Sequence, residues 1–379
     1  MYKSLLFLNE VNHLRVGIIG AGVLGRLIAI DLFKRNYKVT LYDKGDIFSS
    51  KSCSATAAGM LAPWSEAYES TQIAFELGII SLKLWPEILE SLNAVSLLER
   101  QGTAHLALLR DKQQLENYFN RLNRRGIAFE AIEINKNNRK EFIGDYSHVY
   151  SIGYYFPNEA TLNPREFILK CNGFFKKNNI IFKYNSEVIA CEKNKISTEQ
   201  GEFNYDLVIN TMGIGAKKNF EASTETLRGV RGSLVLVNAP LVNVHSVIRL
   251  IHSRFPIYIV PRGNHNYIIG ATSHETECLK PITVESLLEL LSVASHFDKG
   301  FLEANLLEQR VNLRPTFTSN SPHFYTKDGV YFINGLSRNG ITISPALANI
   351  FCNYVHKKRD LFLDNLEIES DIMEKLWLK

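Results

Sequence analysis

Residues 15–43 read RVGIIGAGVLGRLIAIDLFKRNYKVTLYD, and this stretch decides the fold. The apolar run 15–19 predicts a short buried strand, residues 26–35 a helix, and residues 38–42 a second strand. A glycine-rich loop joins the first strand to the helix. A strand, a glycine-rich loop, a helix and a strand in this order are typical of a dinucleotide-binding unit.

The loop, GAGVLG at residues 20–25, fits a GxGxxG motif. Gly20 permits the tight turn, Gly22 lets a pyrophosphate approach the backbone, and Gly25 lets the helix pack closely on the strand. The helix amino terminus offers unpaired N–H groups and the positive end of a dipole to the phosphates. Asp43 ends the second strand, where a carboxylate binds the ribose hydroxyls and disfavours a ribose 2′-phosphate. The motif alone does not separate NAD from FAD.

Composition excludes several classes of protein. The chain has 379 residues, 43 basic and 39 acidic, with a net charge of +4, so a nucleic-acid partner is not expected. Five scattered cysteines without a CxxC pair indicate reduced thiols in a cytoplasmic protein, and ten scattered histidines predict no metal site. The apolar run Leu5–Leu8 is too short for a signal peptide, and no stretch is long enough to span a membrane.

The order of elements predicts a discontinuous α/β architecture. Helix-rich residues 70–93, with Pro86 marking a break or a new helix start, precede an antiparallel block of strands after residue 229. A helix is predicted over 283–297, with Val284, Leu287, Leu288, Leu291 and Ala294 on its apolar face. We therefore predict a Rossmann-like cofactor domain with an interleaved α+β antiparallel-sheet substrate domain. The predicted ranges are 1–85, 150–228 and 312–379 for the cofactor domain, and 86–149 and 229–311 for the substrate domain.

Four further segments lie in the order found in one family of flavoproteins. They are SCSATAAGMLAP at residues 52–63, YIVPR at 258–262 followed by IGAT at 269–272, LRP at 313–315, and RNGI at 338–341. With the glycine loop, they resemble the amino-acid oxidase superfamily of FAD flavoproteins. Within it, the chain is most similar to the glycine oxidases of bacterial thiamine biosynthesis. The resemblance implies FAD as the cofactor.

The resemblance also implies which residues hold FAD. Small residues from Ser54 to Gly59 would let backbone approach the flat flavin ring. The amino terminus of the helix after Arg338 would face the flavin edge that gains negative charge. The implied cofactor-binding residues are Gly20, Gly22, Gly25, Asp43, Ser52, Ser54, Ala55, Ala58, Gly59, Met60, Val188, Thr211, Gly213, Arg338, Asn339, Gly340 and Ile341.

For the substrate, the resemblance implies Arg314, Tyr258 and Arg338. A guanidinium gives a planar fork for a carboxylate, Tyr258 would touch the same carboxylate, and Arg338 would help to fix substrate and flavin. Without the family context, Arg314 would be a solvated surface residue. The chain departs from the family pattern around the substrate, where Pro256, Thr316 and Leu336 replace its usual residues, and this puts glycine itself in doubt as the substrate.

The implied reaction is the oxidative deamination of a small amino acid or amine. Hydride passes from Cα to the flavin, and dioxygen reoxidises the flavin to give hydrogen peroxide. Two alternatives stay open: a dehydrogenase of the same fold that passes electrons to a quinone or protein partner, and a flavin-bearing subunit of a hetero-complex. An NAD dehydrogenase is a more distant alternative, and a homo-oligomer is compatible with the sequence.

Overall fold

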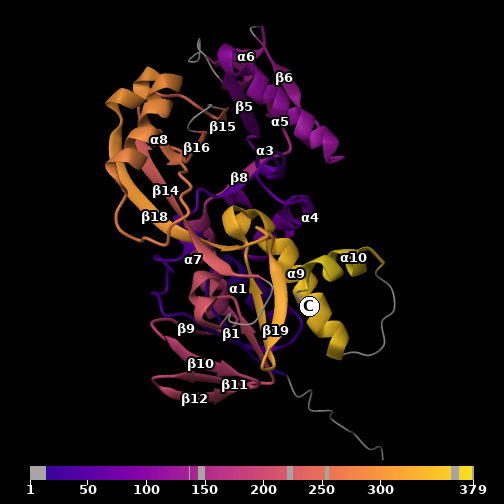
Figure 1. Ribbon diagram of the computed structural model, residues 1–379. Coiled ribbons are helices and arrows are strands. Elements are labelled where there is room, and N and C mark those ends of the chain that lie inside the picture. Colours follow the sequence, from indigo (N-terminus) through magenta and orange to yellow (C-terminus); the bar gives the residue numbers. More distant parts are fainter. Residues whose placement is uncertain are drawn as a thin grey trace, which may run out of the picture.

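The computed structural model describes residues 14–135, 137–143, 150–219, 225–251, 256–359 and 367–377, so the run Leu5–Leu8 lies outside the described residues. Two large sheets dominate the architecture, one low and one high in Figure 1. Among the described residues, no helix has the length and apolar character needed to cross a bilayer, and no cluster of potential metal ligands occurs.

The lower sheet has six strands in the order β19-β20-β13-β1-β2-β9. All neighbours run parallel except β19 and β20. The strands are β1 (Arg15–Ile19), β2 (Lys38–Tyr42), β9 (Ile181–Lys183), β13 (Leu207–Asn210), β19 (His323–Lys327) and β20 (Val330–Asn334). The predicted Rossmann-like sheet is confirmed, with the first two strands beginning and ending at the predicted residues.

Four helices pack with this sheet in one apolar core. They are α1 (Val23–Lys34), α4 (Gln72–Ser91), α7 (Pro164–Lys177) and α9 (Gly340–Arg359). Helix α1 begins three residues before the predicted start, because Gly22 already has the extended conformation of an N-cap. The break predicted at Pro86 is wrong, since α4 runs through it. A proline inside a helix costs about 3 kcal/mol, and the fully buried Trp85 and Leu89 beside it offset that cost.

The upper sheet has eight strands in the order β18-β14-β17-β16-β15-β5-β7-β6. Neighbours are antiparallel except β15 and β5. The strands are β5 (Thr103–Leu108), β6 (Ile132–Ile134), β7 (Tyr150–Phe156), β14 (Leu227–Asn238), β15 (Val247–Ile251), β16 (Ile257–Pro261), β17 (Asn266–Gly270) and β18 (Asn305–Phe317). The predicted antiparallel block is thereby confirmed. The division into two domains at the predicted boundaries stays a prediction, with β7 and the whole of β18, including residues 312–317, lying in this sheet.

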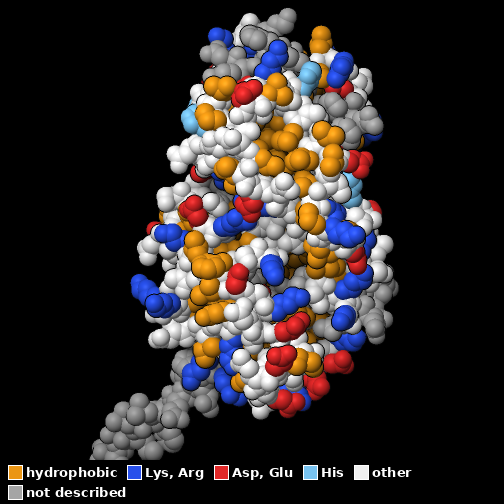
Figure 2. All heavy atoms as spheres, turned by 90° about the vertical axis from the view of Figure 1, so that its left-hand side faces the viewer, with side chains coloured by type: hydrophobic (Ala, Val, Ile, Leu, Met, Phe, Trp, Pro, Cys, Tyr) orange, Lys and Arg blue, Asp and Glu red, His pale blue; other side chains and the backbone are white. Residues whose placement is uncertain are grey.

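Two helices pack with the upper sheet, α5 (Lys112–Arg124) on β5 and α8 (Val284–Phe297) on β14, β16 and β17. The predicted apolar face of α8 is wrong in part: Ala294 is buried and Leu287 and Leu291 pack against the core of this sheet, but two of the five predicted residues do not. Its buried side chains are Ser286, Leu290, Val293, Ala294 and Phe297. Val284 and Leu288 are exposed. Helix α8 lies on the left in Figure 1, and Figure 2, which shows that side, has apolar side chains gathered on its upper part. Apolar residues occur on both faces of this helix, and contact with the sheet selects one of them.

Short elements complete the fold. One small sheet joins β10 (Val188–Glu192), β11 (Lys195–Thr198) and β12 (Gly201–Asn204), and another joins β3 (Met60–Leu61), β8 (Ala160–Leu162) and β4 (Leu98–Glu99). The short helices are α2 (Cys53–Thr56), α3 (Pro63–Glu66), α6 (Arg139–Ile143), α10 (Glu367–Leu376), η1 (Val95–Leu97), η2 (Leu109–Asp111), η3 (Gly213–Asn219), η4 (Lys299–Glu303) and η5 (Ser337–Asn339).

Candidate cofactor and substrate site

The three glycines of the loop have different surroundings. A Cβ on Gly20, which has φ of +100°, would lie 2.7 Å from the Thr211 carbonyl oxygen, and one on Gly25 would lie 2.0 Å from that of Gly20. A Cβ on Gly22 would meet only the Ser54 hydroxyl, at 3.3 Å. Gly20 and Gly25 are therefore required by protein packing, whereas Gly22 borders open space. This is the arrangement that a pyrophosphate close to the backbone needs.

Asp43 lies against the same loop. Its Oδ2 accepts a hydrogen bond from the Ala21 backbone N–H at 2.6 Å, and its Oδ1 accepts one from the Gly45 N–H at 2.7 Å. The carboxylate predicted to bind ribose is thus fixed at the end of β2 beside the phosphate loop. Its contact with ribose stays a prediction.

Arg26 is a functional candidate that the sequence reasoning missed. Its guanidinium is fully buried and donates to the Ala21 carbonyl oxygen at 2.8 Å, to Asn172 Oδ1 at 2.7 Å and to Ser49 Oγ at 3.0 Å. Burial lowers the pKa of Arg26. The side chain links the glycine loop to the segment after β2 and to α7. The available signal was a charged residue on an otherwise apolar buried helix, where an arginine needs several acceptors.

The small-residue segment 52–63 is held by its carbonyl groups. Arg165 Nε donates to the Ala55 carbonyl oxygen at 3.0 Å, Arg262 donates to that of Ala58, and Thr342 Oγ1 donates to that of Met60 at 3.0 Å. Further bonds run from Leu162 N to Gly59 O, from Val23 N to Ser54 Oγ and from Ala55 N to Ser52 Oγ. These bonds join the segment to α1, α7, α9 and the β16–β17 hairpin. Arg165 and Thr342 were not singled out in the sequence.

The other predicted cofactor residues follow β13 or lie on β10, η3, η5 and α9. Thr211 follows β13, and its hydroxyl donates to the carbonyl oxygens of Ile19 at 3.0 Å and Gly20 at 2.9 Å. Asn339 is buried and donates through Nδ2 to Ser70 Oγ at 3.0 Å. Val188 begins β10, Gly213 begins η3 with φ of +56°, Arg338 lies in η5, and Gly340 and Ile341 begin α9. Their contacts with FAD stay predictions.

A partly buried charge cluster joins Arg338 to the upper sheet. Glu66 forms ion pairs with Arg338, whose Nε is 2.6 Å from Oε2, and with Arg249 on β15. Glu69 also pairs with Arg338, and its Oε1 lies 3.5 Å from Arg249 Nη2. Burial alone would raise the pKa of Glu66, but the charges of Arg249 and Arg338 outweigh it, so its pKa is lowered. Glu66 is therefore ionised at neutral pH.

Arg314 and Tyr258 lie close to this cluster. Arg314 donates weakly to the Thr272 carbonyl oxygen at 3.2 Å and the Ser273 hydroxyl at 3.4 Å, and its guanidinium lies where a Cβ on Gly232 would be, 2.5 Å from Nη2. Burial raises the pKa of Tyr258 to about 12, with smaller effects of Arg314 and Glu66. Glu66 also senses the Arg314 charge. Arg338 thus contacts the Glu66 carboxylate, whereas Arg314 and Tyr258 interact with it electrostatically, and the roles of all three toward substrate stay predictions.

Glu159 supports the helix that carries Glu66. It is fully buried before β8, and its carboxylate accepts from the Ser65 N–H at 2.7 Å and the Ser65 hydroxyl at 2.5 Å. Burial raises the pKa of Glu159 to about 7. The hydrogen bonds from Ser65 act in the opposite direction, and the nearby Glu66 charge adds to the increase. Glu159 therefore titrates near neutrality while fixing the amino-terminal turn of α3.

This pKa predicts a specific dependence of stability on pH. Between pH 4.5, the ordinary value, and pH 7, the folded protein holds a proton that the unfolded chain has released, so the free energy of unfolding falls as pH rises. The full effect is on the order of 3 kcal/mol. Glu159→Gln keeps the size of the side chain and abolishes this contribution. We expect the melting temperature of the FAD-loaded variant, relative to that of wild type, to increase as pH rises through this window. A constant difference in melting temperature between the two proteins from pH 4.5 to pH 7 would contradict the raised pKa of Glu159.

Comparison with known proteins agrees with this geometry. The sequence profile of the family described as FAD dependent oxidoreductase matches residues 15–354. A Rhizobium etli protein, ThiO, whose name assigns it provisionally to thiamine biosynthesis as an oxidoreductase, is 28% identical over 88% of this chain and 94% of its own length. A glycine oxidase of Geobacillus kaustophilus is 24% identical over 92% of this chain and 94% of its own length.

The fold is also that of a solved flavoenzyme. A crystal structure of glycine oxidase from Geobacillus kaustophilus superposes with a TM-score of 0.79, covering 95% of this chain and 98% of that one at 21% identity. The profile match spans the glycine loop, the small-residue segment, the upper eight-stranded sheet and most of α9. The chain belongs to the family of FAD dependent oxidoreductases, and its cofactor is FAD.

Proposed function

We propose that the protein catalyses the oxidative deamination of a small amino acid or amine, with dioxygen as the electron acceptor and hydrogen peroxide as a product. The relative named glycine oxidase supports the choice of substrate class, and the relative named ThiO supports a role in thiamine biosynthesis. A cytoplasmic location and a homo-oligomeric state are further proposals that rest on the sequence.

One observation carries the proposal. Among the described residues, Arg314 has no carboxylate within ion-pair distance, whereas Arg338 and Arg249 are both paired with acids. Burial raises the pKa of the Cys53 thiol in the small-residue segment, and the charge of Arg314 offsets part of that increase, so Arg314 interacts electrostatically with this segment. An arginine beside the cofactor segment that makes only weak hydrogen bonds and no ion pair within the described residues is suited to a substrate carboxylate.

The side chains of this chain would bind and orient the substrate. Bound FAD supplies the two-electron acceptor. Arg314 would form the bidentate bond to the carboxylate, and Tyr258, protonated at neutral pH because its pKa is about 12, would donate a second hydrogen bond. Arg338, neutralised by Glu66 and Glu69, would fix the turn before α9 rather than bind a second anion. Hydride loss from Cα requires the amine lone pair, so we propose that the neutral amine is the reactive form.

The visible spectrum of the purified holoenzyme tests this function. Anaerobic addition of a suitable amino acid should bleach the flavin bands, and admission of air should restore them with formation of peroxide. At limiting substrate, the bleaching rate should rise with pH toward the amine's own pKa, because the reactive neutral fraction grows. A rate that falls with pH would reveal an essential protein acid instead. Rapid bleaching with slow recovery in air would replace dioxygen by a quinone or protein acceptor.

A further inference from the structure

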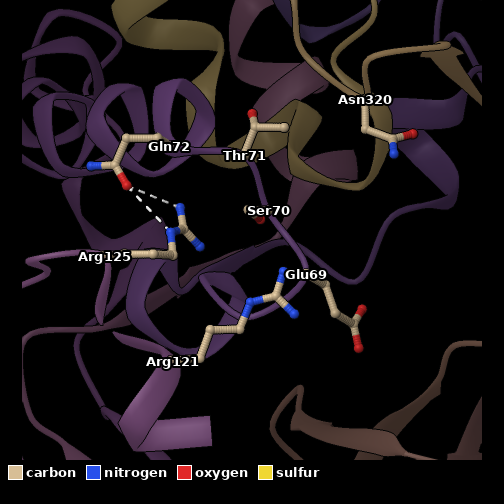
Figure 3. Close-up of a pocket in the computed structure, with 7 residues that line it drawn as sticks. All are labelled: Glu69, Ser70, Thr71, Gln72, Arg121, Arg125 and Asn320. Carbon is tan, nitrogen blue, oxygen red and sulfur yellow. Dashed lines mark hydrogen bonds between the residues drawn. The ribbon is translucent and has the colours of Figure 1, made fainter. Parts of the chain in front are cut away.

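A cavity of about 430 Å³ lies beside the residues that pair with Arg338 and Asn339. It is formed where the turn before α4, helix α5 and the turn after β18 meet (Figure 3). We call it the arginine cavity. Its lining consists of Glu69, Ser70, Thr71, Gln72, Arg121, Arg125 and Asn320.

Two guanidinium groups face this cavity from one side of α5. Arg121 and Arg125 are four residues apart, a spacing that places their side chains together on a helix. Arg121 is exposed and lies over the Tyr68 ring at 4.5 Å. Arg125 is half-buried and donates to Gln72 Oε1 and to the Ala67 carbonyl oxygen. Within the described ranges, no carboxylate lies at ion-pair distance from either guanidinium.

The two cations disfavour each other. The pKa of Arg125 is lowered, first by burial and then by the charge of Arg121, while Tyr118 and Glu76 act in the opposite direction. Glu69 is the acid in the lining, and it already pairs with Arg338 and Arg249. The cavity therefore carries positive charge that the surrounding protein does not fully neutralise. A bound anion would neutralise this positive charge and reduce the repulsion between Arg121 and Arg125.

The cavity adjoins the site around Arg338. Glu69 belongs to its lining and pairs with Arg338, and Ser70 belongs to its lining and exchanges hydrogen bonds with Asn339. Arg125 holds the carbonyl group of Ala67, the residue directly after Glu66. The turn that pairs with Arg338 and Asn339 is therefore also a wall of the cavity, so the cavity and the proposed reaction site share this turn.

We propose that the arginine cavity binds a carboxylate, and that this carboxylate is a second acidic group of the substrate. The substrate would then be an amine with two carboxylates, one on Arg314 and one on Arg121 with Arg125. This inference rests on the proposed function for its substrate, but binding in the cavity does not depend on turnover. Arg121 supplies the fork, because its N–H groups have no hydrogen-bond acceptor among the described residues, and Arg125 supplies the second charge.

Two matched amines test the substrate assignment. N-methylglycine and N-(carboxymethyl)glycine are both secondary amines but carry one and two carboxylates. We expect wild-type holoenzyme to prefer the dicarboxylate by kcat/KM, and Arg121→Gln to reduce that preference about ten- to a hundredfold. Arg124→Gln removes the same charge from an exposed neighbour on α5 that does not line the cavity, and it should leave the preference unchanged. An equal preference in wild type and Arg121→Gln would overturn the substrate assignment.

Calorimetric titration of succinate into the holoenzyme tests the cavity without turnover. Arg314→Ala serves as the background, because it removes the other proposed carboxylate site, and ionic strength is held constant with chloride. A carboxylate site in the cavity is supported if succinate binding to the Arg314→Ala protein is lost when Arg121→Gln is added and is kept when Arg124→Gln is added. If that binding is found while the amine preference is unaffected, the ligand is a free carboxylate and the substrate part is wrong. The proposal is overturned if succinate does not bind to the Arg314→Ala protein and Arg121→Gln leaves the preference for the dicarboxylate amine unchanged. Failure of every amine to bleach the flavin would count against the proposed function alone.

Discussion

Arg314→Ala is expected to lower kcat/KM for an amino acid by about ten- to several-hundredfold while FAD stays bound. A charge-assisted bidentate bond to a carboxylate contributes roughly 1.5–3 kcal/mol, and ~1.4 kcal/mol is a factor of ten. The Arg314 side chain makes only weak bonds to Thr272 and Ser273, so its removal should disturb the fold little. The measurement is kcat/KM at fixed pH, with flavin content determined by absorbance.

Two comparisons separate carboxylate binding from structural support. Arg314→Lys should recover little activity, because a point charge does not reproduce the planar fork. An amine without a carboxylate should respond weakly to either change. Gly232→Ala should mimic part of the defect, since its Cβ would lie 2.5 Å from Arg314 Nη2 and displace the guanidinium. Equal losses on the acid and on the amine would reassign Arg314 to folding or to flavin support.

Gly22→Val is expected to give folded but colourless protein. The new side chain would project into the space beside the loop, where a Cβ meets only Ser54 Oγ at 3.3 Å. A small shift of that hydroxyl is enough to accept the Cβ, whereas a pyrophosphate close to the backbone would be blocked. Absorbance of the purified protein at the flavin bands measures FAD, and far-ultraviolet circular dichroism measures the fold. Full flavin content in the variant would show that the loop does not approach the pyrophosphate at Gly22.

Two other glycines provide controls for this experiment. Gly25→Val should prevent folding as well as FAD binding, because its Cβ would lie 2.0 Å from the Gly20 carbonyl oxygen. Gly173 lies in α7 with no atom near its Cβ position, so Gly173→Ala should keep the flavin and stabilise the helix slightly. The contrast isolates the effect at the phosphate loop from the general cost of replacing a glycine.

The cofactor half of the site was predictable because it is local in the sequence. The loop at residues 20–25, the strands on either side and the acid at Asp43 follow one another within thirty residues, and each depends on short-range backbone geometry. The structure keeps them together, with Asp43 bonded to the loop itself. The small-residue segment 52–63 was also found, but the donors that fix it come from α7, α9 and the β16–β17 hairpin.

The sequence by itself therefore determined the nucleotide fold and, through family motifs, the identity of FAD and the candidates Arg314 and Tyr258. Only the tertiary structure decided which charges meet. Arg249 and Glu66 are 183 positions apart, and Arg121 and Asn320 share a cavity although they lie on different elements. Helix α8 illustrates the same limit, since its periodicity allowed two apolar faces and the sheet selected one. Local patterns encode backbone geometry, whereas ion pairs and burial depend on contacts between distant segments, which no single stretch of sequence specifies.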